Sequence, residues 1–267
     1  MLLNFITWDV SPILFELGPL AVRWYGLSWA LGIWATLMIT QRIFKHENLP
    51  EEWVDKLFMY TVLGTIIGSR VGHCLFYEWD YYSANPLEIL YIWHGGLASH
   101  GGAIGIAVAI FLYNRNVSKK GYIWVMDRLL IGVTLCAASI RFGNLMNSEI
   151  YGHATTLPWG FYFPRDSQWD SQAHHPTQIY EMLAYILAFA LTSWLYWKKD
   201  AIKKPGLIFG AFLISMFGAR FMFEFIKLDQ VAFESGMLLN MGQILSIPFI
   251  VWGVWLVARS KRQESKK

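Results

Sequence analysis

A small set of charged side chains interrupts otherwise apolar stretches of this sequence, and their residue types could do chemistry. Charged groups are costly inside a bilayer, and those found there usually bind a substrate, an ion or one another. Arginine is planar and permanently charged and so matches a phosphate group, whereas histidine accepts a proton near neutral pH. The residues are Arg70, His100, Arg128, Arg141, Arg220 and Glu224.

The densest polar cluster runs from Arg141 to Gly152. Arg141, Asn144 and Glu149 cannot all face one side of a continuous helix, so we expect the helix to end near Asn147 and the chain to fold back. A broken helix end at membrane depth is tolerated where it lines a cavity or is buried in protein. Arginine and asparagine donors there match the phosphate of a lipid head group. These residues alone predict a lipid-binding site reached from the membrane.

Each charged residue also has a structural interpretation that involves no chemistry. Long charged side chains near the ends of a span can extend to the membrane surface, and arginines deeper in the membrane can pair with carboxylates or backbone carbonyls. His100 could be a packing residue, although glycines on both sides of it would let backbone and ligand approach closely. The alternatives are surface extension for Arg128, pairing of Arg70 with Glu78 or a carbonyl, and pairing of Arg141 and Arg220 with Glu149 or Glu224.

The elements that position these residues follow from composition. The chain has 267 residues, of which 55% are apolar and 15% are charged, whereas a soluble domain carries roughly a quarter charged residues. Several uncharged runs approach or exceed the ~20 residues that cross a hydrocarbon core. Such a composition excludes a soluble enzyme, a disordered chain and a domain with a single membrane anchor.

The apolar runs must be helices, because the alternation of a membrane barrel is absent and every backbone polar group needs a partner within its own segment. We therefore predict an all-α integral membrane protein, a bundle of about seven transmembrane helices. Residues 1–258 form one membrane-embedded domain, and residues 259–267 form a basic cytoplasmic tail. The predicted spans are 22–43, 57–77, 97–114, 124–143, 177–197, 206–226 and 237–258.

Orientation follows from the basic residues. Most of the 22 Lys and Arg residues lie in the first, third and fifth connections and in the tail. Basic loops stay in the cytoplasm, so we expect the N-terminus outside and the C-terminus inside. The excess of positive charge then lies next to the anionic lipids of the inner leaflet. We expect no nucleic acid partner. The long connection 144–175 between the fourth and fifth spans should form a small folded head on the outer face.

This orientation places Arg70, His100, Arg141 and Arg220 at one level in the outer half of the membrane. The first 20 residues and residues 81–93 are expected to lie at the outer interface. Cys74 and Cys136 fall within spans, where packing is their expected role. No spacing typical of a metal site or of a cofactor-binding loop is present, so we expect neither a metal nor a cofactor.

Seven segments occur in an order that resembles bacterial prolipoprotein diacylglyceryl transferases. The resemblance covers about residues 10 to 258, and its strength lies in the order of motifs that are individually weak. One departure is visible, because many members have a Tyr where this chain has Met216. The segments are Trp24-Tyr25-Gly26, Ser69 to Gly72 with Phe76-Tyr77, Gly95-Gly96 with His100-Gly101-Gly102, Arg141 to Gly152, His175 to Glu181, Arg220 with Glu224-Phe225, and Met241 to Ser246.

The resemblance implies transfer of the diacylglyceryl group from phosphatidylglycerol to the thiol of the lipobox cysteine in a prolipoprotein signal peptide. The products would be a thioether and glycerol phosphate, in the first step of bacterial lipoprotein maturation. The expected partners are phosphatidylglycerol, prolipoprotein signal peptides and membrane lipids. The expected location is the bacterial cytoplasmic (inner) membrane, crossed several times, with the active site toward the periplasmic half.

That chemistry gives the candidate residues their expected roles. His100 would take the thiol proton, Arg141 would hold the incoming head group, and Arg220 would neutralise the departing phosphate. Asn144 and Glu149 would bind glycerol hydroxyls or orient Arg141. Tyr25 would bond the head group or the signal peptide, unless it is only an interfacial aromatic residue. Gly152 would allow the turn into the head, and Gln178, Tyr180 and Glu181 would support the site or a lateral opening.

Other classes of membrane protein fit the sequence less well. A lipid flippase or secondary transporter, the main alternative, usually has repeated halves and polar groups through the full membrane depth. A retinal photoreceptor needs a Lys in its last span, and residues 235–258 contain none. An intramembrane protease would need a Gly-x-Ser-x-Gly or paired Asp motif, which is absent.

Overall fold

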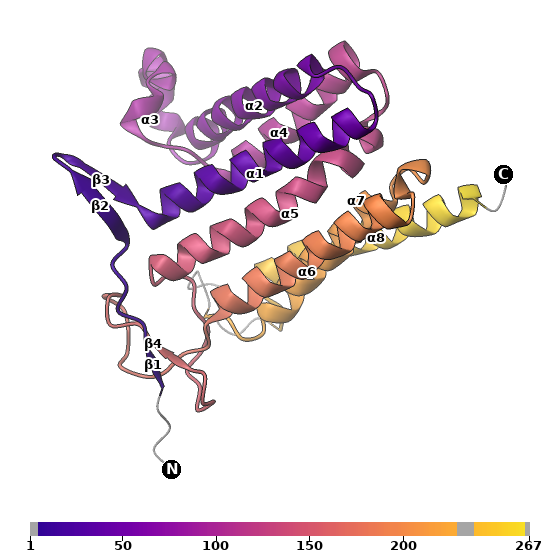
Figure 1. Cartoon of the computed structure of the whole chain (residues 1–267). Helices are drawn as coiled ribbons and strands as arrows, with labels where there is room; N and C mark the ends of the chain where they lie inside the picture. The colour runs from indigo at the N-terminus through magenta and orange to yellow at the C-terminus, as the bar shows by residue number, and fades with distance from the viewer. Residues whose placement is uncertain (1–4, 229–237, 265–267) are drawn as a thin grey trace. The chain divides into compact units, whose positions relative to one another are not determined.

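The computed structural model describes residues 5–228 and 238–264, and helices make up most of that part of the chain (Figure 1). Contacts divide the chain into two compact units. The first unit contains Met1–Ile39 and Met126–Lys267, and the second contains Thr40–Val125. Each unit is held by its own contacts and is described by itself.

Within the described residues, each of the predicted spans coincides with a helix, so the helical fold is confirmed. Three of these helices, α5, α6 and α8, are long and apolar enough to cross a membrane, and α7 is a shorter apolar helix. The number of spans and their orientation stay predictions. The helices are α1 (Trp24–His46), α2 (Glu52–Phe76), α4 (Ser99–Tyr113), α5 (Tyr122–Met146), α6 (Thr177–Lys198), α7 (Leu207–Phe223) and α8 (Met241–Glu264).

Short elements complete the described chain. The prediction of an all-α fold is incomplete, because the described chain also contains two small two-stranded sheets. In the antiparallel pair Leu17 lies opposite Leu20, and Gly18 makes the turn with a φ of 57°, which glycine adopts without steric cost. The elements are β1 (Ile6–Thr7), β2 (Ile13–Leu17), β3 (Leu20–Arg23), α3 (Trp79–Ala84), η1 (Pro86–Leu90), η2 (Ile92–His94), η3 (Asn114–Ser118), β4 (Phe161–Tyr162) and η4 (Ala201–Lys203).

Glycines bring α2 and α4 into close contact in the second unit. A Cβ atom added at Gly68 would lie 2.4 Å from the carbonyl oxygen of Gly101, and one added at Gly105 would lie 2.0 Å from that of Gly64. Gly72 contacts the same turn of α4, because its added Cβ would lie 2.6 Å from the Gly101 Cα. Small residues at four-residue spacing are typical of helix pairs in membranes. The glycines after His100 therefore serve helix packing.

In the first unit, α6, α7 and α8 lie side by side (Figure 1). Gly210 and Gly253 permit the α7–α8 contact, since a Cβ at Gly210 would lie 2.7 Å from the Gly253 carbonyl oxygen. Asp127 on α5 caps the start of α7 by accepting hydrogen bonds from the backbone N–H groups of Gly206 (2.7 Å) and Phe209 (2.8 Å). A carboxylate suits a helix N-terminus, where four N–H groups lack partners.

The segment between α5 and α6 is folded around a small aromatic cluster. Tyr151 and Phe163 stack with ring centroids 4.7 Å apart, and Phe161 and Leu145 complete the buried cluster. The N-terminal segment closes it, because β1 pairs in parallel with β4 and the Trp8 indole donates a hydrogen bond to the Leu145 carbonyl at 2.9 Å. Residues 6–8 are therefore fixed to the predicted head.

Candidate active site

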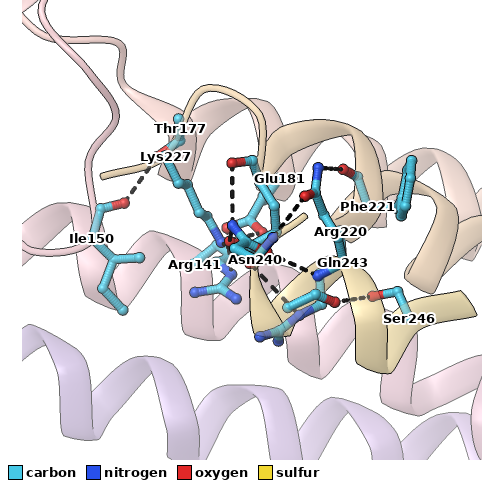
Figure 2. Close-up of polar contacts among 12 residues, drawn as sticks. Arg141, Ile150, Thr177, Glu181, Arg220, Phe221, Lys227, Asn240, Gln243 and Ser246 are labelled. Atoms are coloured by element: carbon cyan, nitrogen blue, oxygen red, sulfur yellow. Dashed lines mark hydrogen bonds and ion pairs between the residues drawn. The ribbon is translucent and has the colours of Figure 1, made fainter. Parts of the chain in front are cut away.

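A buried carboxylate on α6, Glu181, binds two cations from distant parts of the chain (Figure 2). Its Oε2 lies 2.9 Å from Arg141 Nε on α5, and its Oε1 lies 2.8 Å from Lys227 Nζ, just after α7. The Glu181 side chain has no exposed surface, and the Lys227 side chain is 2% exposed. A charge buried to this extent requires a partner, so the three side chains hold one another in place.

A second carboxylate, Glu224, extends this arrangement. Glu224 follows α7 directly, and its Oε1 lies 3.5 Å from Lys227 Nζ and 3.6 Å from Arg220 Nε. The Asn240 side-chain amide donates a hydrogen bond to Glu224 Oε2 at 3.1 Å. Arg141, Glu181, Lys227, Glu224 and Arg220 thus alternate in charge, and these five side chains are called the charge network below.

The charge network contains three cations and two carboxylates, so it carries one more positive than negative charge. The Arg220 side chain is 41% exposed, and its contact with Glu224 is made through Nε. Arg141 is 16% exposed and is paired with Glu181. Both guanidinium groups are permanently charged, and together they can bind an anion.

An amide joins the charge network to the end of α5. Arg141 Nη1 donates to Asn144 Oδ1 at 3.1 Å, and Asn144 Nδ2 donates to Glu149 Oε1 at 2.7 Å. The Gln178 side chain bonds the Glu149 backbone carbonyl at 2.7 Å. The expected alternative of a direct Arg141–Glu149 pair is therefore wrong, because Asn144 lies between them and Glu181 takes the position beside Arg141.

The predicted end of the helix near Asn147 is confirmed, because α5 ends at Met146. The turn itself uses Ser148 (φ 55°) and Ile150 (φ 61°). A left-handed backbone is uncommon for isoleucine and is held here by a hydrogen bond from the Thr177 hydroxyl to the Ile150 carbonyl at 2.8 Å (Figure 2).

Gly152 has a role that differs from the expected one. Its φ is not positive, so it does not make the turn into the head. Gly152 instead pairs with Lys227 across an antiparallel bridge, and a Cβ at this position would lie 2.3 Å from the Ile226 carbonyl oxygen. A side chain would separate the two backbones, so the absence of one at Gly152 brings the Lys227 segment to α5.

Tyr25 lies beside the same end of α5. A Cβ added at Gly143 would be 2.9 Å from Tyr25 Cδ2, so the tyrosine ring occupies the space that this glycine leaves. An apolar cavity of about 210 Å³ continues from there between α1, α5 and α6. Phe142 and Met182 line it, and they directly follow Arg141 and Glu181 in the sequence.

The remaining sequence candidates, His100 and Arg70, belong to the second unit. His100 lies exposed in the first turn of α4. Arg70 is 3% exposed and donates hydrogen bonds to the carbonyls of Glu88, Ile89 and Gly95, and its guanidinium carbon lies 4.9 Å from the centre of the Tyr82 ring. Of the two structural alternatives for Arg70, the carbonyl one is correct.

Sequence reasoning missed Lys227 as a member of the site and gave Glu181 a supporting place only. Spacing could have found Lys227, since Arg220, Glu224 and Lys227 follow the four- and three-residue steps of one helix face. Glu181 is the only charged residue between Thr177 and Trp197 on α6. Arg128 was expected to extend to the surface, but it is 3% exposed, so that expectation is wrong.

The described residues contain no group of His, Cys, Asp and Glu side chains that could hold a metal ion. The fold and the charge network together define a helical protein of the membrane type, with a buried cluster of charged side chains at the ends of its helices.

Comparison with known proteins narrows this class to one family. The chain belongs to the prolipoprotein diacylglyceryl transferase family, whose model matches residues 12–259. The chain is 48% identical to the phosphatidylglycerol–prolipoprotein diacylglyceryl transferase of Porphyromonas gingivalis, over 96% of this chain and 95% of the relative. It is 45% identical to the enzyme of that name from Chloroherpeton thalassium, over 97% and 96%. It is 43% identical to that from Tolumonas auensis, over 97% and 99%.

Proposed function

We propose that this protein transfers the diacylglyceryl group of phosphatidylglycerol to the cysteine thiol of a prolipoprotein, the first step of lipoprotein maturation. The family and the names of relatives matched over nearly the whole chain support this activity. The observation that carries it within the molecule is the charge network, whose net positive charge suits an anionic head group.

The reaction replaces one bond by another at a glycerol carbon. The thiolate sulfur attacks the carbon that bears the phosphate ester, a C–S bond forms, the C–O bond breaks, and glycerol phosphate leaves with the electron pair. Negative charge therefore grows on the phosphate oxygens in the transition state. Arg220, whose side chain is 41% exposed, neutralises that charge, and Arg141 holds the head group. His100 takes the thiol proton.

The residues at the end of α5 recognise the glycerol part of the head group. In the described part of the chain, Asn147 Oδ1 and Gln178 Oε1 are buried acceptors without a hydrogen-bond donor, and the buried Ser148 hydroxyl has no partner. Buried polar atoms normally have partners, and glycerol hydroxyls supply donors for them. Glu149 and Asn144 orient Arg141 through their hydrogen bonds.

The apolar cavity between α1, α5 and α6 provides space for an acyl chain beside Arg141. Tyr25 at its end bonds the head group or the signal peptide. A hydroxyl is absent at Met216, where many family members have a Tyr, and the buried Tyr185 on α6 interacts with Arg141. We assign to Tyr185 the support of this guanidinium.

We further propose that the chain crosses a bacterial inner membrane about seven times. Its N-terminus and the head lie outside, and its basic tail lies inside. The distribution of Lys and Arg supports this orientation, as do three described helices apolar enough to span. Residues 144–175 then face the periplasm, where translocated signal peptides are available.

The deciding experiment incubates the purified protein with phosphatidylglycerol and a lipobox peptide. We expect the peptide to gain the mass of a diacylglyceryl group and glycerol phosphate to be released, while a peptide with its Cys changed to Ser stays unmodified. An unchanged Cys peptide would exclude the proposed activity.

The base assignment has a separate test. His100→Gln is expected to abolish turnover at every pH, since glutamine accepts no proton. Near-normal rates across the pH range would exclude His100 as the base while leaving the transfer reaction itself in place.

A further inference from the structure

A second cavity lies between α6, α7 and α8, at the ends of these helices that are remote from the charge network. Its volume is about 470 Å³, and its lining includes Leu195 on α6, Leu207 on α7 and Val257 on α8. Glu181 lies 14 residues before Leu195 on α6, which at 1.5 Å per residue separates the two regions by about 20 Å. This cavity is thus distinct from the proposed active site.

The lining of this cavity changes character along its length. Aliphatic side chains such as Leu191, Ala211 and Ile214 form the walls. Three lysines, Lys199, Lys204 and Lys261, lie at the ends of α6 and α8 and before α7, and among the described residues no carboxylate lines the cavity. An apolar groove that ends in ammonium groups matches one kind of molecule, a lipid with an anionic head group.

The indole of Trp194 strengthens this match. The Lys199 ammonium lies 5.1 Å from the centre of the Trp194 ring, which directs the lysine along the surface of α6. Tryptophan is enriched at the level where lipid head groups meet acyl chains. Trp194 therefore marks the boundary between the part of the groove for an acyl chain and the part for a phosphate.

We propose that this groove binds an anionic phospholipid that is not a substrate, with an acyl chain between α6, α7 and α8 and the phosphate at Lys199, Lys204 and Lys261. A soluble anion would need only the lysines, and a neutral lipid would need only the walls, whereas both are present here. The bound lipid would fix the three helices at the end where the charge network does not reach.

Native mass spectrometry of the full-length protein can test this proposal with phosphatidylserine, compared with phosphatidylcholine of the same acyl chains. We expect the protein to retain one phosphatidylserine in preference to phosphatidylcholine. The double variant K199Q/K261Q should bind that lipid about thirtyfold more weakly, because it lacks two charges near the head group. The matched control is Lys203→Gln, whose ammonium pairs with Asp200 instead and is absent from the lining.

A groove-filling variant, Ala211→Phe, leaves every charge in place and should displace the same lipid. Equal retention of the two lipids, or unchanged retention in both K199Q/K261Q and Ala211→Phe, would overturn the proposal. Diacylglyceryl transfer at saturating phosphatidylglycerol should be unchanged in K199Q/K261Q, so the result is separable from the proposed function.

Discussion

The arginines of this protein interrupt apolar stretches of the sequence in similar ways, but Arg70 has different partners from Arg141 and Arg220. Arg70 gives its hydrogen bonds to backbone carbonyls within its own unit and contacts the Tyr82 ring. Arg141 and Arg220 face carboxylates, and the Arg220 side chain is 41% exposed. Neutral carbonyls occupy the donors of Arg70, as expected for a structural residue, whereas we propose that the guanidinium groups of the charge network bind an anionic ligand. We therefore infer that the type of partner, carbonyl or carboxylate, distinguishes a structural arginine from a ligand-binding one better than the depth of the arginine in the membrane does.

The variant Arg141→Ala tests this difference between the arginines and should cause the largest loss of turnover. We expect turnover to fall by about 10³ or more, because the charge that holds the phosphate head group in place for the reaction is lost. Helix content should persist, since Asn144 and Gln178 still hold the end of α5. Mass spectrometry of the lipobox peptide measures turnover, and circular dichroism in detergent checks folding. Substantial activity in a folded Arg141→Ala protein would contradict the assigned role.

Lys227→Met tests the centre of the charge network. The substitution leaves Glu181 and Glu224 buried without their shared cation, which costs about 3–5 kcal/mol for a broken buried pair. We expect a lower midpoint of thermal unfolding and reduced turnover. Lys227→Arg restores the charge and should recover most of the stability. A stable and active Lys227→Met protein would show that the network does not depend on its central cation.

Arg70→Ala tests the other half of the comparison, the structural role of Arg70. The carbonyls of Glu88, Ile89 and Gly95 lose their donor. Because these residues are partly buried or exposed, each loss costs less than a buried unsatisfied group, for which the cost is about 1–3 kcal/mol. The expected result is a lower unfolding temperature with an unchanged rate per folded molecule, opposite to the result for Arg141→Ala. Activity normalised to the folded fraction distinguishes the two. A lost rate in a fully folded Arg70→Ala protein would move Arg70 into the catalytic group.

The smallest expected effect concerns the head. The His174 imidazole contacts Asp170 Oδ1 and the Gly152 carbonyl, each at 2.7 Å. The hydrogen bond with His174 lowers the pKa of Asp170 below its ordinary value of 3.8. The stabilisation is therefore complete above that value and is lost as the pH falls through the lowered pKa.

Hydrogen exchange of residues 152–176 measures this effect. We expect lower amide protection factors, which correct for the intrinsic exchange rate at each pH, for the wild type in acid and for Asp170→Ala at neutral pH. Charge network variants such as Lys227→Arg should leave the pH dependence of the head unchanged. Exchange in the head that does not respond to Asp170→Ala would contradict this contribution.

The sequence predicted the helices well because long apolar runs leave few alternatives for the backbone. It also predicted the end of α5, where the positions of Arg141, Asn144 and Glu149 cannot share one helix face. The partners of the arginines could not be predicted in this way. Arg141 and Glu181 are 40 residues apart in the sequence, and their pairing depends on how α5 and α6 pack.

Short elements escaped the sequence analysis for a different reason. Strands β1 and β4 have two residues each, so no alternating pattern can develop, and their pairing depends on the aromatic cluster of the head. Gly152 was assigned to a turn because glycine commonly makes turns. Its real function depends on the Ile226 carbonyl, which only the folded chain brings near.

The parallel pairing of β1 with β4 has a consequence for the order of assembly. Ile6 pairs with Phe161, so the first strand has no partner until four of the long helices, α1, α2, α4 and α5, have been synthesised. Ordering the N-terminal segment is therefore a late event during synthesis. A bulky fusion placed before β1 would then impair closure of the head while leaving the insertion of the earlier helices unaffected.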